Sequence, residues 1–259
     1  MITIGNQLTQ TQTLLKDYPQ SSLESIILTA LGDSSSSFRY QSIDQLKFEL
    51  ALRRAIVQAA VDLNNSDFSF AVFRKSKGNP TYWERVSNGG LRLKQGAKPS
   101  DAIKDIYVNG KLYASECATA MIIVYLKALL SVYPEPLFNE AFSDITLMNW
   151  HHIPRLLSDV GQMQPATVYL PGDRRYFANP DVDPVTPEWQ GENTIDLSKD
   201  FYYGHGVGIY NAEEIISELN KNRKRDSNKE AYLMDSAGRP DFKKLANIYL
   251  TYKKEHSNE

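Results

Sequence analysis

The most apolar run of the chain, ASECATAMIIVYLKALL at residues 114–130, limits the possible folds more than any other feature. The apolar stretch after Cys117 meets Lys127 after about nine residues, which is too short to cross the roughly 30 Å hydrocarbon core of a bilayer. A run of this length is typical of a helix buried in a globular protein. The rest of the chain must therefore pack around this helix.

The start of this run raises a question about its single thiol. Cys117 is the only cysteine in 259 residues, so the chain cannot form an internal disulfide, which points weakly to a reducing compartment. If Ser115 caps the helix, Glu116 and Cys117 lie in its first turn, where the positive end of the helix dipole favours a thiolate. A lone cysteine is also a common small buried hydrophobe. Position alone leaves both interpretations open.

Composition excludes several classes of protein. Hydrophobic residues make up 42% and charged residues 23%, as in ordinary globular domains, and the formal net charge is −2. No global basic field favours binding to nucleic acid or to an anionic membrane. The first twenty residues lack a basic segment followed by an apolar one, so we expect synthesis in the cytoplasm without a signal peptide.

Periodicity predicts an α+β chain. Apolar residues recur at helical spacing over 42–63, whereas the segment 201–210 alternates like a strand. The other predicted helices share helical spacing or capping signals: 23–31, 99–110, the Cys117 segment, 135–142 and the segment after Asn211. The short alternating runs between residues 67 and 95 predict a β-meander. We expect a single domain over 1–259, with N-terminal helices (about 20–64) packed onto it and a flexible tail from about 254 to 259.

Several chemistries lack their motifs. No phosphate-binding loop, dinucleotide-binding glycine pattern, G-x-S-x-G, CxxC or HExxH occurs, so we expect no cofactor and no metal site. The acidic residues of 179–192 do not follow the calcium-loop pattern and are more typical of a solvated loop. His151 and His152 are adjacent, and neighbours rarely point at one centre, so a polar loop end is the better interpretation.

A thiol nucleophile needs a base that is usually distant in sequence. His205 lies between two glycines in the predicted strand 201–210, where glycines leave room for a substrate. Glu192 follows WQG in a predicted loop before that strand. A helix-borne cysteine facing a strand-borne base is the papain-like arrangement, although His205 could equally be a satisfied core histidine.

Beyond these single residues, several longer sequence segments resemble a known family. GNPTYWERV, PSDAIKDIYVNGKLYASECATAMIIVY, NWHH, EWQGEN and YGHGVGI, in this order, closely resemble the small transglutaminases of spore-forming bacilli. That family is the protein-glutamine γ-glutamyltransferase that cross-links spore-coat proteins. The similarity runs from about Tyr40 to about Arg225 and loosely beyond. It implies a compact papain-like core that works without calcium or a pro-segment.

The resemblance also implies roles for individual residues. The family's nucleophile matches Cys117, its principal acidic partner matches Glu192, and a partly redundant acid matches Glu116. The motif histidine falls on His205. Aromatic residues that line the family's substrate tunnel fall on Phe70, Trp150 and Trp189. Expected partners are proteins with reactive glutamine and lysine, in the spore coat. A longer loop near 162–167 departs from the family and puts substrate choice in doubt.

A carboxylate base for a thiol needs a special environment. The ordinary side-chain pKa values of about 8.5 for Cys and about 4.3 for Glu oppose proton transfer by roughly 6 kcal/mol, against roughly 3 kcal/mol for a His base. Burial raises a glutamate pKa, so Glu192 is workable in an apolar tunnel, and we take it as the main partner. An ionised Glu116 would oppose thiolate formation. We therefore expect Glu116 to be protonated or turned away, unless it acts as the base.

Two other functions stay open from the sequence. The first is a papain-like cysteine amidohydrolase or peptidase with water as the acceptor. The second is a non-enzymatic coat or scaffold protein with an inert Cys117.

Overall fold

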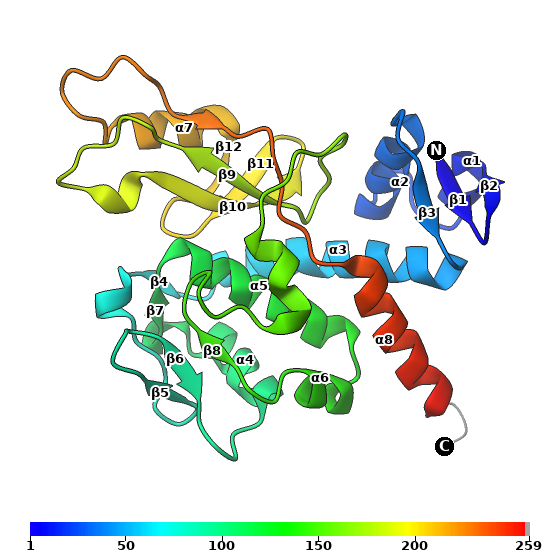
Figure 1. Ribbon diagram of the computed structural model, residues 1–259, viewed down its shortest axis with the longest axis horizontal. Helices are drawn as coiled ribbons and strands as arrows, with labels where there is room; N and C mark the ends of the chain where they lie inside the picture. Colours follow the sequence, from blue (N-terminus) through cyan, green and yellow to red (C-terminus); the bar gives the residue numbers. More distant parts are fainter. Residues whose placement is uncertain (257–259) are drawn as a thin grey trace.

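A five-stranded antiparallel sheet covers one side of two long central helices in the computed structural model, which describes residues 1–256 (Figure 1). Its strand order is β12-β11-β10-β9-β13. The strands of this sheet are β9 (Arg174–Ala178), β10 (Gly191–Ser198), β11 (Phe201–Gly204), β12 (Gly208–Asn211) and β13 (Tyr232–Leu233). In the register of β9 with β10, Phe177 lies opposite Glu192 and Tyr176 opposite Asn193. The centre of the sheet thus carries the acidic block that the sequence singles out.

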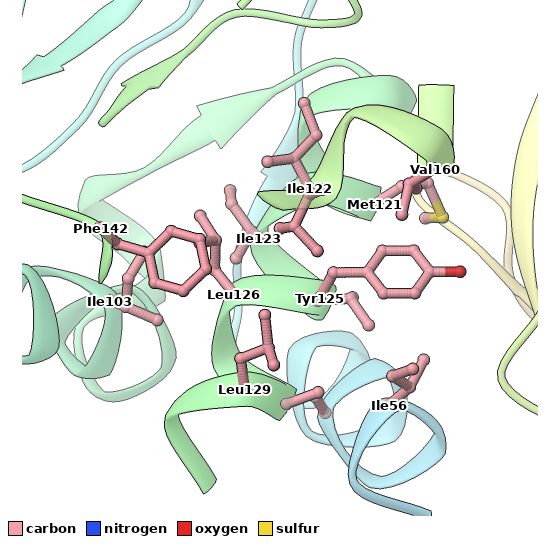
Figure 2. Packing of buried hydrophobic residues seen from close by; sticks show 14 of the residues in the cluster. Ile56, Ile103, Met121, Ile122, Ile123, Tyr125, Leu126, Leu129, Phe142 and Val160 are labelled. Carbon is pink, nitrogen blue, oxygen red and sulfur yellow. The ribbon is translucent and has the colours of Figure 1, made fainter. Parts of the chain in front are cut away.

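The two central helices are α3 (Ile43–Asn64) and α5 (Cys117–Val132), which pack against each other and against β10. Ser42 caps α3 by accepting a hydrogen bond from the Gln45 N–H at 3.2 Å. Helix α5 is buried on almost every side, as a helix that is apolar all round must be. Figure 2 shows its side chains meeting those of neighbouring elements, including Ile56, Ile103 and Phe142.

Helix α5 is enclosed on its other side by short elements (Figure 1). These are α4 (Pro99–Val108), α6 (Glu135–Ala141), a three-stranded sheet of β5 (Trp83–Arg85), β6 (Leu91–Leu93) and β8 (Thr146–Leu147), and a parallel pair of β4 (Ser69–Phe70) and β7 (Ala114–Ser115). Four 3-10 helices complete the connections: η1 (Phe73–Lys75), η2 (Gly110–Leu112), η3 (Arg155–Gly161) and η4 (Pro187–Trp189). The β4–β7 pair matters most, because β7 leads directly into Cys117.

The N-terminal residues form a separate small layer above one end of α3 (Figure 1). Its elements are β1 (Ile2–Ile4), β2 (Gln7–Thr9), α1 (Thr11–Leu15), α2 (Leu23–Asp33) and β3 (Phe38–Tyr40), with strand order β2-β1-β3. A second buried cluster joins this layer to Leu46 and Leu50 of α3. Helix α3 is thus shared between the N-terminal layer and the main core.

The remaining helices close the fold. Helix α7 (Ala212–Asn220) covers one face of the large sheet, and α8 (Phe242–Glu255) packs along α3. Because α8 continues to Glu255, the flexible tail predicted from about residue 254 falls partly on helix and otherwise on 257–259, outside the described residues. No helix within residues 1–256 is long and apolar enough to cross a membrane.

The predicted class, a single α+β domain with a buried helix starting at Cys117 on an antiparallel sheet, is confirmed. The predicted helices are present, and Asn211 caps α7 with a capping box. The predicted meander is only partly right: β5 and β6 form a hairpin, but β4 pairs in parallel with β7 and the next residues form η1.

Three local predictions are wrong. The segment 201–210 is a hairpin, with His205 in its turn. Glu192 lies in β10 and not in a loop. Ser115 belongs to β7, and the cap of α5 is Glu116. In the hairpin, alternation continues through a glycine-rich turn, so periodicity alone cannot show where the chain reverses.

Candidate active site

A cavity of about 750 Å³ opens over the first residues of α5. Cys117 and Asn193 lie in its wall, together with side chains from β4, β9 and the loop after β8. The exposed side chains of Arg74 and Glu188 also line it. A concave site of this size, in which polar side chains interrupt a mainly apolar surface, is typical of a substrate-binding pocket.

Glu116 fixes the start of α5. Its carboxylate accepts hydrogen bonds from the backbone N–H of Ala118 at 2.6 Å and of Thr119 at 2.9 Å, and from the Thr119 hydroxyl at 2.6 Å. The Thr119 oxygen in turn accepts the N–H of Asn149, which ties the loop that carries Trp150 to the helix. Glu116 is therefore turned onto the helix end, one of the two arrangements that we expected, and lies beside the thiol as a cap.

The Cys117 thiol is partly exposed to the cavity and otherwise enclosed. Burial raises its pKa, and the carboxyls of Glu192 and Glu116, when ionised, raise it further. The Asn193 side-chain amide donates to Sγ at 3.4 Å, and this contact lowers the pKa of Cys117. The position at the helix start therefore does not by itself give a thiolate, because the adjacent carboxylates and burial oppose it.

Glu192 is buried and, like His205, does not line the cavity, but its carboxyl lies within electrostatic reach of Cys117. Burial raises the pKa of Glu192 well above its usual range and the Glu116 charge adds to this, while the backbone N–H of His205 opposes the shift. Its Oε1 atom has no hydrogen-bond partner within residues 1–256. A neutral carboxyl at rest fits this environment.

Gly204 of β11 provides the space for the Glu192 side chain. A Cβ atom at Gly204 would lie 2.9 Å from Cγ and 3.0 Å from Oε1 of Glu192, closer than real contacts allow. Gly204, the first glycine of the YGHGVG block, thus leaves the space that the Glu192 side chain fills.

His205 does not line the cavity. Its Nε2 lies 3.2 Å from the Ser69 carbonyl oxygen and its Nδ1 lies 3.0 Å from the Tyr203 hydroxyl. The ring stacks on Phe68 with centroids 4.5 Å apart. Burial lowers the pKa of His205 to about 4. Both ring nitrogens are thus engaged with groups other than Cys117, which is the geometry of the core histidine that the sequence left open.

The three predicted tunnel aromatics do not lie together. Phe70 and Trp150 line the cavity at Cys117. Trp189 instead lines a second cavity of about 510 Å³, which also contacts Gly206 and Tyr210. The structure therefore brings together Cys117, Glu116, Glu192, Phe70 and Trp150, and leaves His205 and Trp189 to one side.

Sequence reasoning missed three residues of the wall: Asn193, Arg174 and Tyr176. Arg174 donates from Nη1 to Asn193 Oδ1 at 2.6 Å. Burial, then the charges of Cys117 and Glu192, raise the pKa of Tyr176 to about 12. Asn193 directly follows Glu192, and that adjacency was the only available signal. Arg174 and Tyr176 reach the site only through the pairing of β9 with β10.

The family model described as protein-glutamine gamma-glutamyltransferase matches residues 1–249. This chain belongs to that family. Among the curated members, the protein-glutamine gamma-glutamyltransferase of Bacillus cereus strain G9842 is 42% identical over 93% of this chain and 86% of its own length. The Bacillus mycoides strain KBAB4 transglutaminase is also 42% identical, over 95% of this chain and 88% of its own.

A solved transglutaminase from Geobacillus stearothermophilus, without its C-terminal extension, shares the fold. It superposes with a TM-score of 0.74 at 44% identity, covering 80% of this chain and 98% of its own. The chain is thus a transglutaminase, an acyltransferase, as the sequence predicts. The family match also begins earlier than the predicted Tyr40, since it includes the N-terminal layer. Within residues 1–256, no three His, Cys, Asp or Glu side chains gather as metal ligands would.

Proposed function

We propose that this transglutaminase forms ε-(γ-glutamyl)lysine isopeptide bonds through a thioester on Cys117. The observation that carries the proposal is the location of Cys117 at the start of α5, in the wall of a cavity of about 750 Å³ and within electrostatic reach of the buried Glu192. Sγ attacks the γ-carboxamide carbon of a glutamine, and the C–N bond breaks to release ammonia. The ε-amine of a lysine then attacks the thioester carbon. The new amide bond forms, and the bond between that carbon and the Cys117 sulfur breaks.

Glu192 is proposed as the group that exchanges protons with these steps. In its ionised form it takes the proton of the thiol and passes it to the leaving amide nitrogen, which departs as ammonia. It then takes a proton from the attacking amine and gives it to the departing Cys117 sulfur, which restores both the thiol and the carboxylate. Because its pKa is raised, Glu192 is a stronger base than a free glutamate, and this lowers the free energy needed to take a proton from a thiol. The same burial also raises the pKa of Cys117, so other groups must stabilise the thiolate.

The apolar walls favour an amine over water as the acceptor. Phe70 and Trp150 stand in the wall around Cys117, where they reduce the access of bulk water to the thioester. An amidohydrolase would instead give water an open path to the acyl group. The membership in an acyltransferase family supports transfer over hydrolysis.

We further propose that the reaction needs no calcium and that the substrates are spore-coat proteins. The acidic loop after β9 is already neutralised in part, since Asp181 pairs with Lys224 at 3.1 Å and accepts the Lys229 N–H. The spore-coat role rests on the likeness to transglutaminases of spore-forming bacilli. It is tested by looking for ε-(γ-glutamyl)lysine in the insoluble coat with and without the gene. Retention of activity in excess EDTA tests calcium independence.

Incorporation of a fluorescent primary amine into casein tests the reaction. We expect signal from the wild type, none from Cys117→Ala, and a loss of tenfold or more from Glu192→Gln, with exposed Glu213→Gln as the matched control. Ammonia release without amine uptake would identify a hydrolase. Near-normal transfer by Glu192→Gln combined with Glu116→Gln, with none from His205→Ala, would make His205 the base and overturn the assignment of Glu192.

A further inference from the structure

A chain of two hydrogen bonds joins a buried arginine of the large sheet to the sulfur of Cys117. Arg174 donates from Nη1 to Asn193 Oδ1 at 2.6 Å, and Asn193 donates from Nδ2 to Cys117 Sγ at 3.4 Å. Arg174 is also anchored through Nε, which donates to the Val160 carbonyl at 2.7 Å. The three residues of the chain come from different elements: β9, β10 and the start of α5.

This arrangement leaves the Asn193 amide a single orientation. A guanidinium has only donors, so the Asn193 oxygen must face Arg174 and the NH₂ group must face the sulfur. A rotated amide would set two donors against each other and remove the only donor aimed at Sγ by a side chain of the described residues. Arg174 thus ensures that Cys117 meets a hydrogen-bond donor.

The charge of Arg174 lacks a carboxylate partner. Arg174 is only 3% exposed and has no ion pair within residues 1–256, whereas the buried Arg53 pairs with both Glu49 and Asp173. Its guanidinium instead stacks over the Trp150 ring at 4.3 Å. Burial lowers the pKa of Arg174 to about 10, so it stays cationic at neutral pH. A buried, unpaired cation is costly, and an anion formed nearby offsets that cost.

The other ionisable groups around the sulfur do not provide this charge. Eight face Cys117 or line its cavity: Glu116, Glu192, Tyr176, Tyr203, His151, Arg74, Glu188 and Arg174 itself. Glu116 and Glu192 disfavour a thiolate, and the two tyrosines keep their protons because burial raises the pKa of each. His151, Arg74 and Glu188 are exposed. Arg174 is the buried cation of the set.

We propose that Asn193 and Arg174 stabilise the thiolate form of Cys117, Asn193 by donating directly to the sulfur and Arg174 as a positioning residue that acts through Asn193. The inference rests on the proposed function, because it gives the sulfur of Cys117 a chemical role. Burial and the two glutamates raise the pKa of Cys117. The pair of Asn193 and Arg174 acts in the opposite direction and favours the thiolate.

The rate of alkylation by iodoacetamide tests this directly, because Cys117 is the only thiol of the chain. The second-order rate constant is measured from pH 5.5 to 10 by intact mass. Asn193→Asp keeps the size of the side chain and an acceptor for Arg174, but replaces the side-chain donor to sulfur with a carboxylate, while the Asn193 backbone N–H remains. Asn193→Ala is measured beside it, because it removes the same side-chain donor without adding a charge. We expect alkylation at pH 7 to slow tenfold or more and the midpoint of the pH profile to rise by at least about one unit.

Arg174→Gln tests the second residue, and Arg175→Gln is its control. Arg175 is buried next to it in β9, but donates to the Ser236 and Met234 carbonyls, away from the thiol. We expect Arg174→Gln to raise the alkylation midpoint and to lower kcat with little change in KM, and Arg175→Gln to leave the midpoint unchanged. Each profile is repeated with His151→Asn, so that titration of an imidazole is not taken for that of the thiol.

A folded Asn193→Asp with the wild-type alkylation profile would overturn the role of Asn193. A wild-type profile in folded Arg174→Gln would overturn that of Arg174. A wild-type profile in folded Asn193→Ala would also overturn the role of Asn193, and Asn193→Ala gives the comparison if Asn193→Asp does not fold. Failure of the proposed function would be seen separately, as amine transfer that persists in Cys117→Ala, whereas alkylation reads the thiol whatever acyl group it accepts.

Discussion

At the scale of single residues, His205 behaves as a buried neutral group in the fold. Its pKa falls to about 4 in the folded chain, whereas an unfolded chain protonates histidine near pH 6.5. Between these values the unfolded state binds one more proton, so the free energy of unfolding falls as pH drops from about 6.5 towards 4. The full effect is about 3 kcal/mol.

Urea denaturation at a series of pH values tests this expectation. His205→Gln should be less stable than the wild type at pH 7 and should lose less stability on acidification. His152→Gln, at an exposed position, should follow the wild-type curve. Parallel curves for wild type and His205→Gln would mean that His205 protonates equally in both states.

Glu116 combines two effects that a single substitution separates. Glu116→Ala removes three accepted hydrogen bonds at the start of α5, so the free energy of unfolding should fall by about 1–2 kcal/mol. It also removes a negative charge that raises the pKa of Cys117, so alkylation at pH 7 should become faster. Asp241→Ala removes the cap of α8 and should cost comparable stability without changing alkylation. Slower alkylation in Glu116→Ala would contradict the charge argument.

The residues that could be predicted share one property: their signal is local in sequence. Cys117 and Glu116 stand at the start of a long apolar run, which marks a helix end. Asn193 and Arg174 act together only because β9 and β10 pair, with Arg174 opposite the residue two positions after Asn193. No periodicity within either segment encodes that contact.

At the scale of elements, the β11–β12 hairpin controls the space around Glu192. Gly204→Ala should displace the Glu192 side chain, because its Cβ would lie 2.9 Å from Glu192 Cγ. The strand backbone itself tolerates alanine, since Gly204 is not among the glycines with positive φ. We expect amine incorporation to fall tenfold or more while the chain stays folded.

Gly32→Ala is the matched control for this crowding. Its Cβ would lie 2.3 Å from the Thr11 hydroxyl oxygen, in the N-terminal layer away from Cys117. It should lower Tm without lowering amine incorporation per folded molecule. Normal activity in Gly204→Ala would show that Glu192 can move aside without loss of function.

The same hairpin explains why periodicity misled at this point. From Tyr203 to Ile209 every second residue is a glycine, which resembles strand alternation, yet the chain reverses at 205–207. Gly206 and Gly208 have φ of 106° and 109°, values that a side chain disfavours, and these glycines allow the tight return. The glycines in this run predicted room for an approaching substrate. In the structure they instead allow one strand of the hairpin to return beside the other.

At the scale of the whole molecule, one buried carboxylate joins distant segments. Asp173 accepts hydrogen bonds from Arg53 of α3 at 2.9 Å and from Arg239, before α8, at 2.7 Å and 2.6 Å. Asp173→Asn removes the carboxylate that Arg53 and Arg239 share and leaves Glu49 as the one carboxylate paired with the buried Arg53, so we expect a loss of about 3 kcal/mol in unfolding free energy. The exposed pair of Asp17 with Lys47 gives the contrast: Asp17→Asn should change stability by less than about 1 kcal/mol.

Helix α3, which carries Arg53, also packs against the N-terminal layer. We therefore expect the whole chain to unfold cooperatively. Leu46 and Leu50 are buried among the N-terminal residues, while Leu52 and Ile56 of the same helix belong to the main core. Neither cluster can open without exposing one face of α3, so residues 1–40 and the catalytic core should lose structure together. This expectation follows the single domain that the sequence predicts.

Hydrogen exchange followed by mass spectrometry in increasing urea gives a separate transition for each segment. We expect peptides of α2 and of α5 to lose protection at the same urea concentration in the wild type. In Asp173→Asn both transitions should shift to lower urea by the same amount, because Asp173 stabilises a unit that includes both. Loss of protection in α2 well before α5 would divide the chain into two folding units and overturn the single domain.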